Sequence, residues 1–227
     1  MAEYYKVDGR KITLREYWNI ARSWKALVAW IAARLGTPMQ LSIGFRQPDS
    51  VRELEIAESE FSPQAKAKLQ PLLEQCLQLG FHSPRFYSFE TIRRDTRTSF
   101  IAMLHRSGEF TLRLMHTLAT NATPPVENVL VVLLSELKDG TFFFTSDQRA
   151  KFKTPPGILN NRLIGGTPLQ LIQSHQRKLA ELGVRNPPKS VRSAEAMDDV
   201  WNRYEKVSLD FQVGRGLYVR MTPEQGR

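Results

Sequence analysis

Apolar residues recur along the chain at two spacings, and the spacing separates expected helices from expected strands. Thr13 with Glu16 three residues later forms a capping box, which predicts that a helix starts here, and Gly36 is the expected stop. Apolar residues then follow at intervals of three and four, which predicts one buried stripe. The stripe consists of Ile20, Trp24, Leu27, Val28, Ile31 and Leu35.

Three further helices are predicted from their start signals. Ser62 before Pro63, Thr167 before Pro168, and Ser193 are expected N-caps. We expect Pro71 to kink or split the first of these helices. The expected buried stripes are Leu69, Leu72, Leu73, Cys76 and Leu77; Leu169, Ile172, His175, Leu179 and Leu182; and Met197, Val200, Trp201 and Tyr204.

Alternating apolar and polar residues predict strand pairs near both ends of the chain. Near the N-terminus we expect a hairpin of 4–7 with 10–12 around Asp8-Gly9, and a second pair of 39–46 with 52–57. Near the C-terminus we expect a hairpin of 207–213 with 217–221.

The middle of the chain predicts a strand meander with a definite register. A turn at Ser107-Gly108 would pair Ser99 with His116, and Asp139-Gly140 would join strands 128–137 and 141–145. The first of these turns would gather Ile101, Met103, Phe110, Leu112 and Leu114 on one face. Residues 129–134 are apolar on both faces, so we expect a central strand covered on each side.

The element pattern predicts an α+β fold in which an antiparallel meander built from hairpins is packed by about four helices. The expected segments are 1–60, with the N-terminal hairpin, helix and strand pair; 61–184, with a helix, the central meander and a helix; and 185–227, with the C-terminal helix and hairpin. Together they are expected to form one compact domain.

Composition narrows the setting of the protein. The 227 residues are 41% apolar and carry a net charge of +9, and the single cysteine excludes an intramolecular disulfide. The longest apolar run, residues 26–33, is far below the ~20 residues of a membrane span. The first residues do not have the pattern of a secretory signal, so we expect a cytoplasmic protein without a transmembrane span.

The positive charge is concentrated in residues 149–192, where nine cations accompany a single acid, Glu181. Such a segment could bind the phosphates of nucleic acid, with Phe142, Phe143 and Phe144 stacking on bases. Solvated loops and packing phenylalanines are the alternative. The candidate cations of the segment are Arg149, Lys151, Lys153, Arg162, Arg177 and Lys178.

An anion site is the second candidate in this region. Arg162 and the Gly165-Gly166 turn precede the expected helix at Thr167, and helix N-termini can hold anions. The same residues could simply turn the chain into a capped helix.

Metal, cofactor and catalytic sites are not predicted. The four histidines lack ligand spacing, and the expected register places His105 and His116 about 20 Å apart on a strand pair. We interpret His175 as a core or interface residue, and Cys76 as buried core.

The first predicted helix carries Trp18 and Trp30 off its apolar stripe, together with basic residues. Exposure of these two side chains would indicate a protein partner or a peripheral membrane contact. Packing on the terminal hairpin is the alternative.

Several motifs between about residues 70 and 182 resemble those of a loose group of uncharacterised bacterial proteins. They are Leu79-Gly80-Phe81, Ser135 to Thr141, Thr145-Ser146, Pro155-Pro156-Gly157, and a helix with His175 and Leu179. The resemblance implies no activity, substrate or site.

Three hypotheses for function follow. The leading hypothesis is a non-enzymatic interaction or regulatory domain with a protein partner. The alternatives are nucleic-acid binding through residues 149–192, and an enzyme or small-ligand binder whose site forms only in three dimensions.

Overall fold

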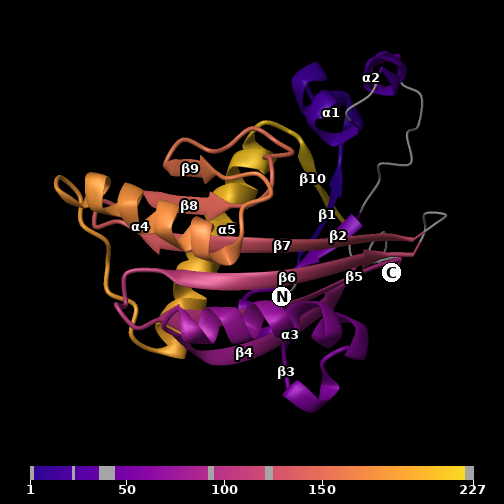
Figure 1. Ribbon diagram of the computed structural model, residues 1–227. Coiled ribbons are helices and arrows are strands. Elements are labelled where there is room, and N and C mark those ends of the chain that lie inside the picture. The colour runs from indigo at the N-terminus through magenta and orange to yellow at the C-terminus, as the bar shows by residue number, and fades with distance from the viewer. Residues whose placement is uncertain (1–2, 22–23, 36–43, 92–94, 121–124, 223–227) are drawn as a thin grey trace.

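The computed structural model describes residues 3–21, 24–35, 44–91, 95–120 and 125–222 (Figure 1). These residues form five α-helices and ten strands, which confirms the α+β fold. The helices are α1 (Leu14–Ala21), α2 (Lys25–Arg34), α3 (Pro63–Gln78), α4 (Pro168–Gly183) and α5 (Ala194–Gly214). Short 3-10 turns are η1 (Gly9–Lys11), η2 (Val51–Leu54) and η3 (Glu58–Glu60).

The main sheet has seven strands in the order β3-β4-β5-β6-β7-β8-β9, antiparallel except for the parallel pair β8 and β9. Its register confirms the predicted meander: Ser99 lies opposite His116, and Glu136 lies opposite Phe142 across the Asp139-Gly140 turn. The strands are β3 (Glu55–Ile56), β4 (Phe81–Glu90), β5 (Thr96–His105), β6 (Thr111–Ala119), β7 (Val126–Glu136), β8 (Phe142–Ser146) and β9 (Ile158–Arg162).

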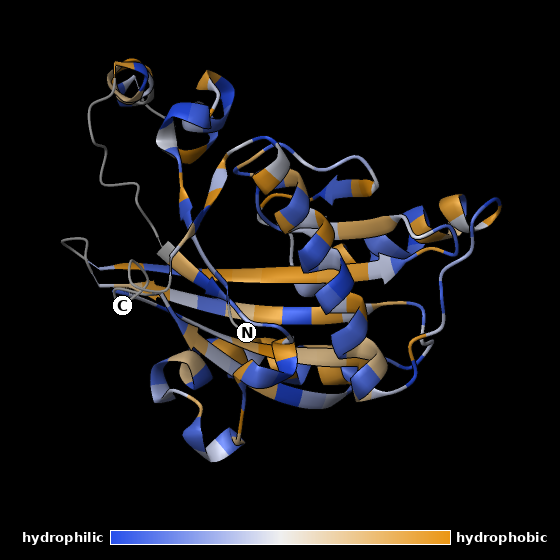
Figure 2. Cartoon of the chain, turned by 180° about the vertical axis from the view of Figure 1, so that it is seen from behind, coloured by the Kyte–Doolittle hydropathy of each residue, from blue (hydrophilic) through white to orange (hydrophobic). Residues whose placement is uncertain are grey.

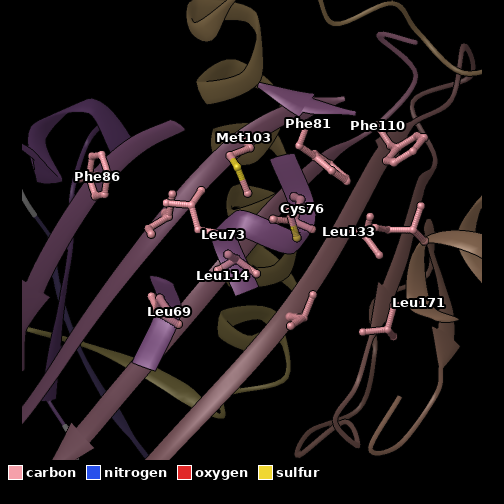
Figure 3. Packing of buried hydrophobic residues seen from close by; sticks show 14 of the residues in the cluster. Leu69, Leu73, Cys76, Phe81, Phe86, Met103, Phe110, Leu114, Leu133 and Leu171 are labelled. Atoms are coloured by element: carbon pink, nitrogen blue, oxygen red, sulfur yellow. The ribbon is translucent and has the colours of Figure 1, made fainter. Parts of the chain in front are cut away.

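Both faces of this sheet are covered, as the apolar run in β7 predicts. Val131 and Leu133 belong to the core cluster beneath α3 and α4, whereas Val132 and Leu134 belong to the cluster beneath α5. Figures 1 and 2 show α3 and α4 on one face of the sheet and α5 across the other. Figure 3 shows the first cluster, in which Leu69, Leu73 and Cys76 of α3 meet side chains of the sheet.

The predicted start of each long helix is confirmed. The side chains of Ser62, Thr167 and Ser193 accept hydrogen bonds from backbone N–H groups in the first turns of α3, α4 and α5. The helix α3 continues through Pro71, so this proline does not split it. Two stripe positions were wrong, since Leu77 and Leu169 are exposed, and Leu171 is buried instead.

The prediction of a C-terminal hairpin was wrong, because residues 207–213 continue α5. Two of the positions of this stretch that face the body are the polar Ser208 and Gln212, one and two turns beyond Tyr204, and Leu209 faces the body beside them. Apolar periodicity therefore did not reveal the helix, and the alternation of Val207, Leu209 and Phe211 looked like a strand. The strands β4 and β9 were not predicted.

Both predicted N-terminal strand pairs were also wrong. The strands β1 (Glu3–Val7), β2 (Gly44–Gln47) and β10 (Tyr218–Met221) form a separate sheet in the order β10-β1-β2. Residues 9–11 are η1 rather than a strand, and residues 51–54 are η2. Residues 39–43 lie outside the described part of the chain. The first and last described strands of the chain thus lie side by side.

The predicted N-terminal helix is capped as expected, with Thr13 and Glu16 exchanging hydrogen bonds, but it is described as two helices, α1 and α2. Its apolar stripe is not buried: Ile20, Trp24, Leu27, Val28, Ile31 and Leu35 are all exposed. No helix among the described residues is long and apolar enough to cross a membrane.

Candidate functional site

A buried arginine lies in the middle of the main sheet. Arg113 is on β6, the central strand, opposite Ala102 of β5 and Val132 of β7, and only 5% of it is exposed. Its neighbours Leu112 and Leu114 belong to the core beneath α3 and α4. Because side chains alternate along a strand, Arg113 points to the opposite face, beneath α5.

The guanidinium of Arg113 is only partly paired. Nη1 donates to Oε1 of Glu205 on α5 at 2.5 Å. The guanidinium carbon lies 3.9 Å from the ring centroid of Trp201 and 4.6 Å from that of Phe100. Within the described structure, Nε and Nη2 are buried and have no hydrogen-bond partner.

These two unpaired groups have a particular geometry. In a planar guanidinium, Nε and Nη2 lie on one edge, and their N–H bonds point in nearly the same direction. A carboxylate accepts from such an edge with both of its oxygens. A buried donor is costly unless it finds an acceptor, so this edge is suited to bind one.

Arg113 lines a cavity of about 330 Å³ between the sheet, α5 and the small sheet. This volume is at the lower end of the range of small-molecule sites. Apolar side chains make up most of the wall, and Arg113, Glu205 and Arg46 bring charge to it. The apolar wall residues are Phe45, Pro48, Val51, Leu54, Phe89, Phe100, Met115 and Leu209.

A second, more polar cavity of about 500 Å³ shares Tyr204, Ser208 and Tyr218 with the first. Four of the predicted anion-binding cations line it, namely Arg149, Lys151, Lys153 and Arg162. The structure therefore brings four of the six predicted cations together in the cavity that adjoins the one lined by Arg113.

Arg162, like Arg113, has a guanidinium that packs on an aromatic ring and is only partly hydrogen-bonded. Its guanidinium carbon lies 4.7 Å from the ring centroid of Phe144, and it donates to the carbonyl of Gln148 and to Asn160. Its Nε is buried without a partner among the residues described. Burial lowers the pKa of this guanidinium.

Tyr204 on α5 lies at the junction of the two cavities and stacks on Phe144 with ring centroids 5.5 Å apart. Burial raises the pKa of its hydroxyl to about 12, against the opposing effect of Arg162. The phenol is therefore neutral at physiological pH and can donate a hydrogen bond to a ligand.

The other predicted anion-binding residues lie elsewhere. Arg177 and Lys178 are on α4, which packs on the opposite face of the sheet, and Lys178 pairs with Glu181. Gly165 has a positive φ of 70°, and a Cβ at Gly166 would lie 2.8 Å from Leu163, so both glycines are explained by the turn itself. Residues 149–192 therefore do not form one basic face.

The aromatic and nucleophilic candidates are core residues. Phe142, Phe143 and Phe144 are all buried, which leaves none of them open for stacking on a base. Burial raises the pKa of the Cys76 thiol to about 12, so Cys76 is not a nucleophile at neutral pH. In the described residues no group of three histidine, cysteine or acidic side chains could hold a metal ion.

His175 is buried, as predicted, and its two ring nitrogens are matched by hydroxyls. Nε2 lies 3.0 Å from Ser135 Oγ, and Nδ1 lies 2.8 Å from Thr145 Oγ1. It packs on Phe143 on the face covered by α4, away from both cavities. Of the residues considered for a site near the start of α4, only Arg162 lines a cavity. His175 and the Gly165-Gly166 turn line neither of the two cavities.

The two candidate tryptophans differ. Trp18 is 54% exposed, whereas Trp30 packs against the small cluster of Ile12, Tyr17, Ala33 and Leu217. Trp24, which was assigned to the buried stripe, is 71% exposed. The inward and outward sides of α2 are thus the reverse of those predicted.

Sequence reasoning missed Arg113 and its partner Glu205. The available signal was a charged residue at an alternating position between Leu112 and Leu114, in a strand next to one predicted to be covered on both faces. Recognising it requires knowing that the second face of β6 is also covered, which α5 decides. Comparison with known protein families, with curated proteins and with solved structures finds no match for this chain.

Proposed function

We propose that the protein binds a small organic acid, with an apolar body and a carboxylate head, in the cavity lined by Arg113. The observation that carries this proposal is the unpaired Nε/Nη2 edge of a buried arginine on the wall of an apolar cavity. Ligand binding of this kind is the alternative whose site forms only in three dimensions, and it suits a regulatory domain that senses a metabolite.

The chemistry of the two parts of the cavity defines the ligand class. The edge of Arg113 supplies two parallel donors, which suit the two oxygens of a carboxylate. The phenylalanine, leucine and methionine side chains on the wall would remove the apolar body of the ligand from water, with a gain of roughly 25 cal/mol per Å² of apolar surface. An alcohol or amide of the same shape would use the apolar wall but satisfy the arginine edge less well.

The test uses a panel of aliphatic and aromatic carboxylic acids, each paired with its primary alcohol and its amide. We expect some acids to raise the melting temperature and to bind in calorimetry, with the matching alcohols at least ~10-fold weaker, because charge-assisted hydrogen bonds are the stronger kind. Equal binding of acids and alcohols would contradict the assignment of Arg113 as the anchor.

Two variants test whether the ligand binds in this cavity. Arg113→Lys keeps the charge but loses the two-donor edge, so affinity for the acid should fall about 10-fold or more. Ser208→Phe would fill the space shared by both cavities without changing Arg113. Arg97→Lys is the matched control, because Arg97 is an exposed arginine on β5 paired with Glu90. If Arg113→Lys binds the acid as tightly as the control variant, the proposal fails.

A further inference from the structure

The helices α1 and α2 both present apolar side chains to solvent. Along α2 and its two capping residues, the exposed side chains recur at helical spacing and form one stripe of Trp24, Leu27, Val28, Ile31 and Leu35. On α1, Leu14 and Trp18 are exposed one turn apart. Figures 1 and 2 show both helices standing clear of the seven-stranded sheet.

The inner side of α2 is already used. Ala29, Trp30 and Ala33 pack on the cluster that contains Ile12, Tyr17 and Leu217. The attachment is reinforced by Glu16, which accepts hydrogen bonds from Arg215 and from the backbone N–H of Lys153. The outward stripe therefore belongs to an anchored helix pair, and its cover must come from outside the described structure.

The charge of residues 9–35 indicates what kind of surface covers the exposed apolar stripe. From residue 9 to residue 35 the chain has six cations and a single acid, Glu16, and this acid is buried and paired with Arg215. Lys11, Arg15, Lys25 and Arg34 are exposed, and within the described residues none of them has an ion pair with an acid. The apolar stripe is thus accompanied by positive charge that no acid among the described residues pairs with.

We propose that α1 and α2 dock on the surface of an anionic lipid bilayer. Exposed tryptophan and leucine beside lysine and arginine is the pattern of helices that lie in a membrane interface, where apolar side chains enter the acyl boundary and cations meet lipid phosphates. Tryptophan favours this region because its ring is amphipathic. A second copy of the chain fits less well, because a twofold contact would bring the same cations of both copies together.

The test measures binding of the full chain to sedimented vesicles, of phosphatidylcholine alone or with about 30 mol % phosphatidylglycerol. We expect binding at least ~10-fold stronger to the anionic vesicles, falling as salt rises, because exposed charges are screened. Tryptophan fluorescence should shift to the blue on binding, as Trp18 and Trp24 leave water. Absence of binding to anionic vesicles at low salt overturns the proposal.

Double variants test whether the exposed residues of α1 and α2 are the ones that contact the vesicle. Leu27→Gln with Ile31→Gln, and separately Arg15→Gln with Lys25→Gln, should each reduce vesicle binding about 10-fold or more. Leu77→Gln with Val126→Gln is the control for apolar exposure, and Arg177→Gln with Arg185→Gln is the control for charge. All four apolar side chains are exposed to a similar degree, so unchanged melting temperatures are expected. Equal loss of binding in the control variants overturns the assignment.

The same variants distinguish a protein occupant from lipid. Sedimentation velocity should show a monomer over a wide concentration range in the absence of vesicles. A dimer that the Leu27→Gln, Ile31→Gln variant dissociates would identify a second copy as the cover and overturn the lipid proposal. Because the vesicle test involves neither Arg113 nor the cavities, its failure leaves the carboxylate proposal unaffected.

Discussion

At the scale of single residues, burial decides the chemistry of the polar side chains in this protein. Arg113, His175 and Glu16 are all buried, but their surroundings differ. His175 has a hydroxyl at each ring nitrogen, and Glu16 accepts hydrogen bonds from Arg215, Thr13 and Lys153. Arg113 has one edge for which the described residues provide no acceptor. Only the last of these arrangements indicates a ligand; the other two are complete within the fold.

His175 leads to a prediction about acid stability. Burial, with a smaller effect from His105, lowers its pKa from 6.5 to about 3. Below pH 6.5 the unfolded chain therefore binds a proton that the native protein does not, and unfolding is favoured as pH falls toward 3. This one residue should cost up to about 1.4 kcal/mol per pH unit in that window.

The measurement is urea unfolding of wild type and His175→Gln between pH 7 and pH 5. We expect the variant to be less stable at pH 7 but to have a shallower dependence on pH. Burial also lowers the pKa of His105, so some slope remains. His82→Gln, at an exposed histidine, is the control and should keep the wild-type slope. An unchanged slope in His175→Gln would contradict a neutral buried imidazole.

At the scale of elements, short-range turn and cap chemistry determines where helices begin and how the central strands pair. The C-terminal half of α5 illustrates where periodicity fails. Ser208, Leu209 and Gln212 line cavities rather than pack in a core, and two of the three are polar, so this half of the helix lacks the apolar stripe by which helices are recognised. The same polar positions are what leave room for a ligand beneath α5.

The junction between α1, α5 and the loop at Lys153 gives a second prediction. Burial would raise the pKa of Glu16, but Arg215 and the N–H groups of Thr13 and Lys153 lower it to about 2. Glu16→Gln leaves the half-buried Arg215 without a carboxylate and with only Gln212 as a side-chain acceptor, so we expect a loss of about 3 kcal/mol in the free energy of unfolding at pH 7. Chemical denaturation of wild type and variant measures this loss. The control is Glu74→Gln, at an exposed position of α3, which should change the free energy of unfolding by less than about 0.5 kcal/mol.

The pH dependence of this difference has a definite sign. Because the native pKa of Glu16 is lowered, its contribution is fully present above about pH 4.5 and is lost as pH falls toward 2. The gap between wild type and Glu16→Gln should therefore narrow across that window. A gap that stays constant down to pH 3 would show that the ion pair is not its source.

At the scale of the whole molecule, a sheet covered on both faces supports two separate surfaces. The α5 face contains the cavities with Arg113 and Arg162, whereas α1 and α2 lie on the small sheet formed by both ends of the chain. Regions with few buried apolar contacts open more readily than central strands. Local opening should therefore require less free energy in α1 and α2 than in the central strands of the main sheet.

Hydrogen exchange measures this difference. Backbone amides of β5, β6 and β7 should exchange slowest, because these strands are paired on both sides and buried on both faces. Amides of α1 and α2 should exchange fastest among the helices, because their apolar side chains lie largely in water. Equal protection of α2 and β6 in the free protein would contradict the exposed stripe.

Local sequence signals were enough to predict the α+β class, the register of the β5–β6 and β7–β8 hairpins and the caps of α3, α4 and α5. Each of these depends on residues close together in the chain, such as Asp139-Gly140 or Thr167 with Gln170. The partner of β1, the outward direction of the α2 stripe and the burial of Arg113 depend on contacts between distant parts of the chain and could not be predicted. Periodicity shows that a side of a helix or strand is apolar or charged, but what covers that side is set by elements distant in sequence.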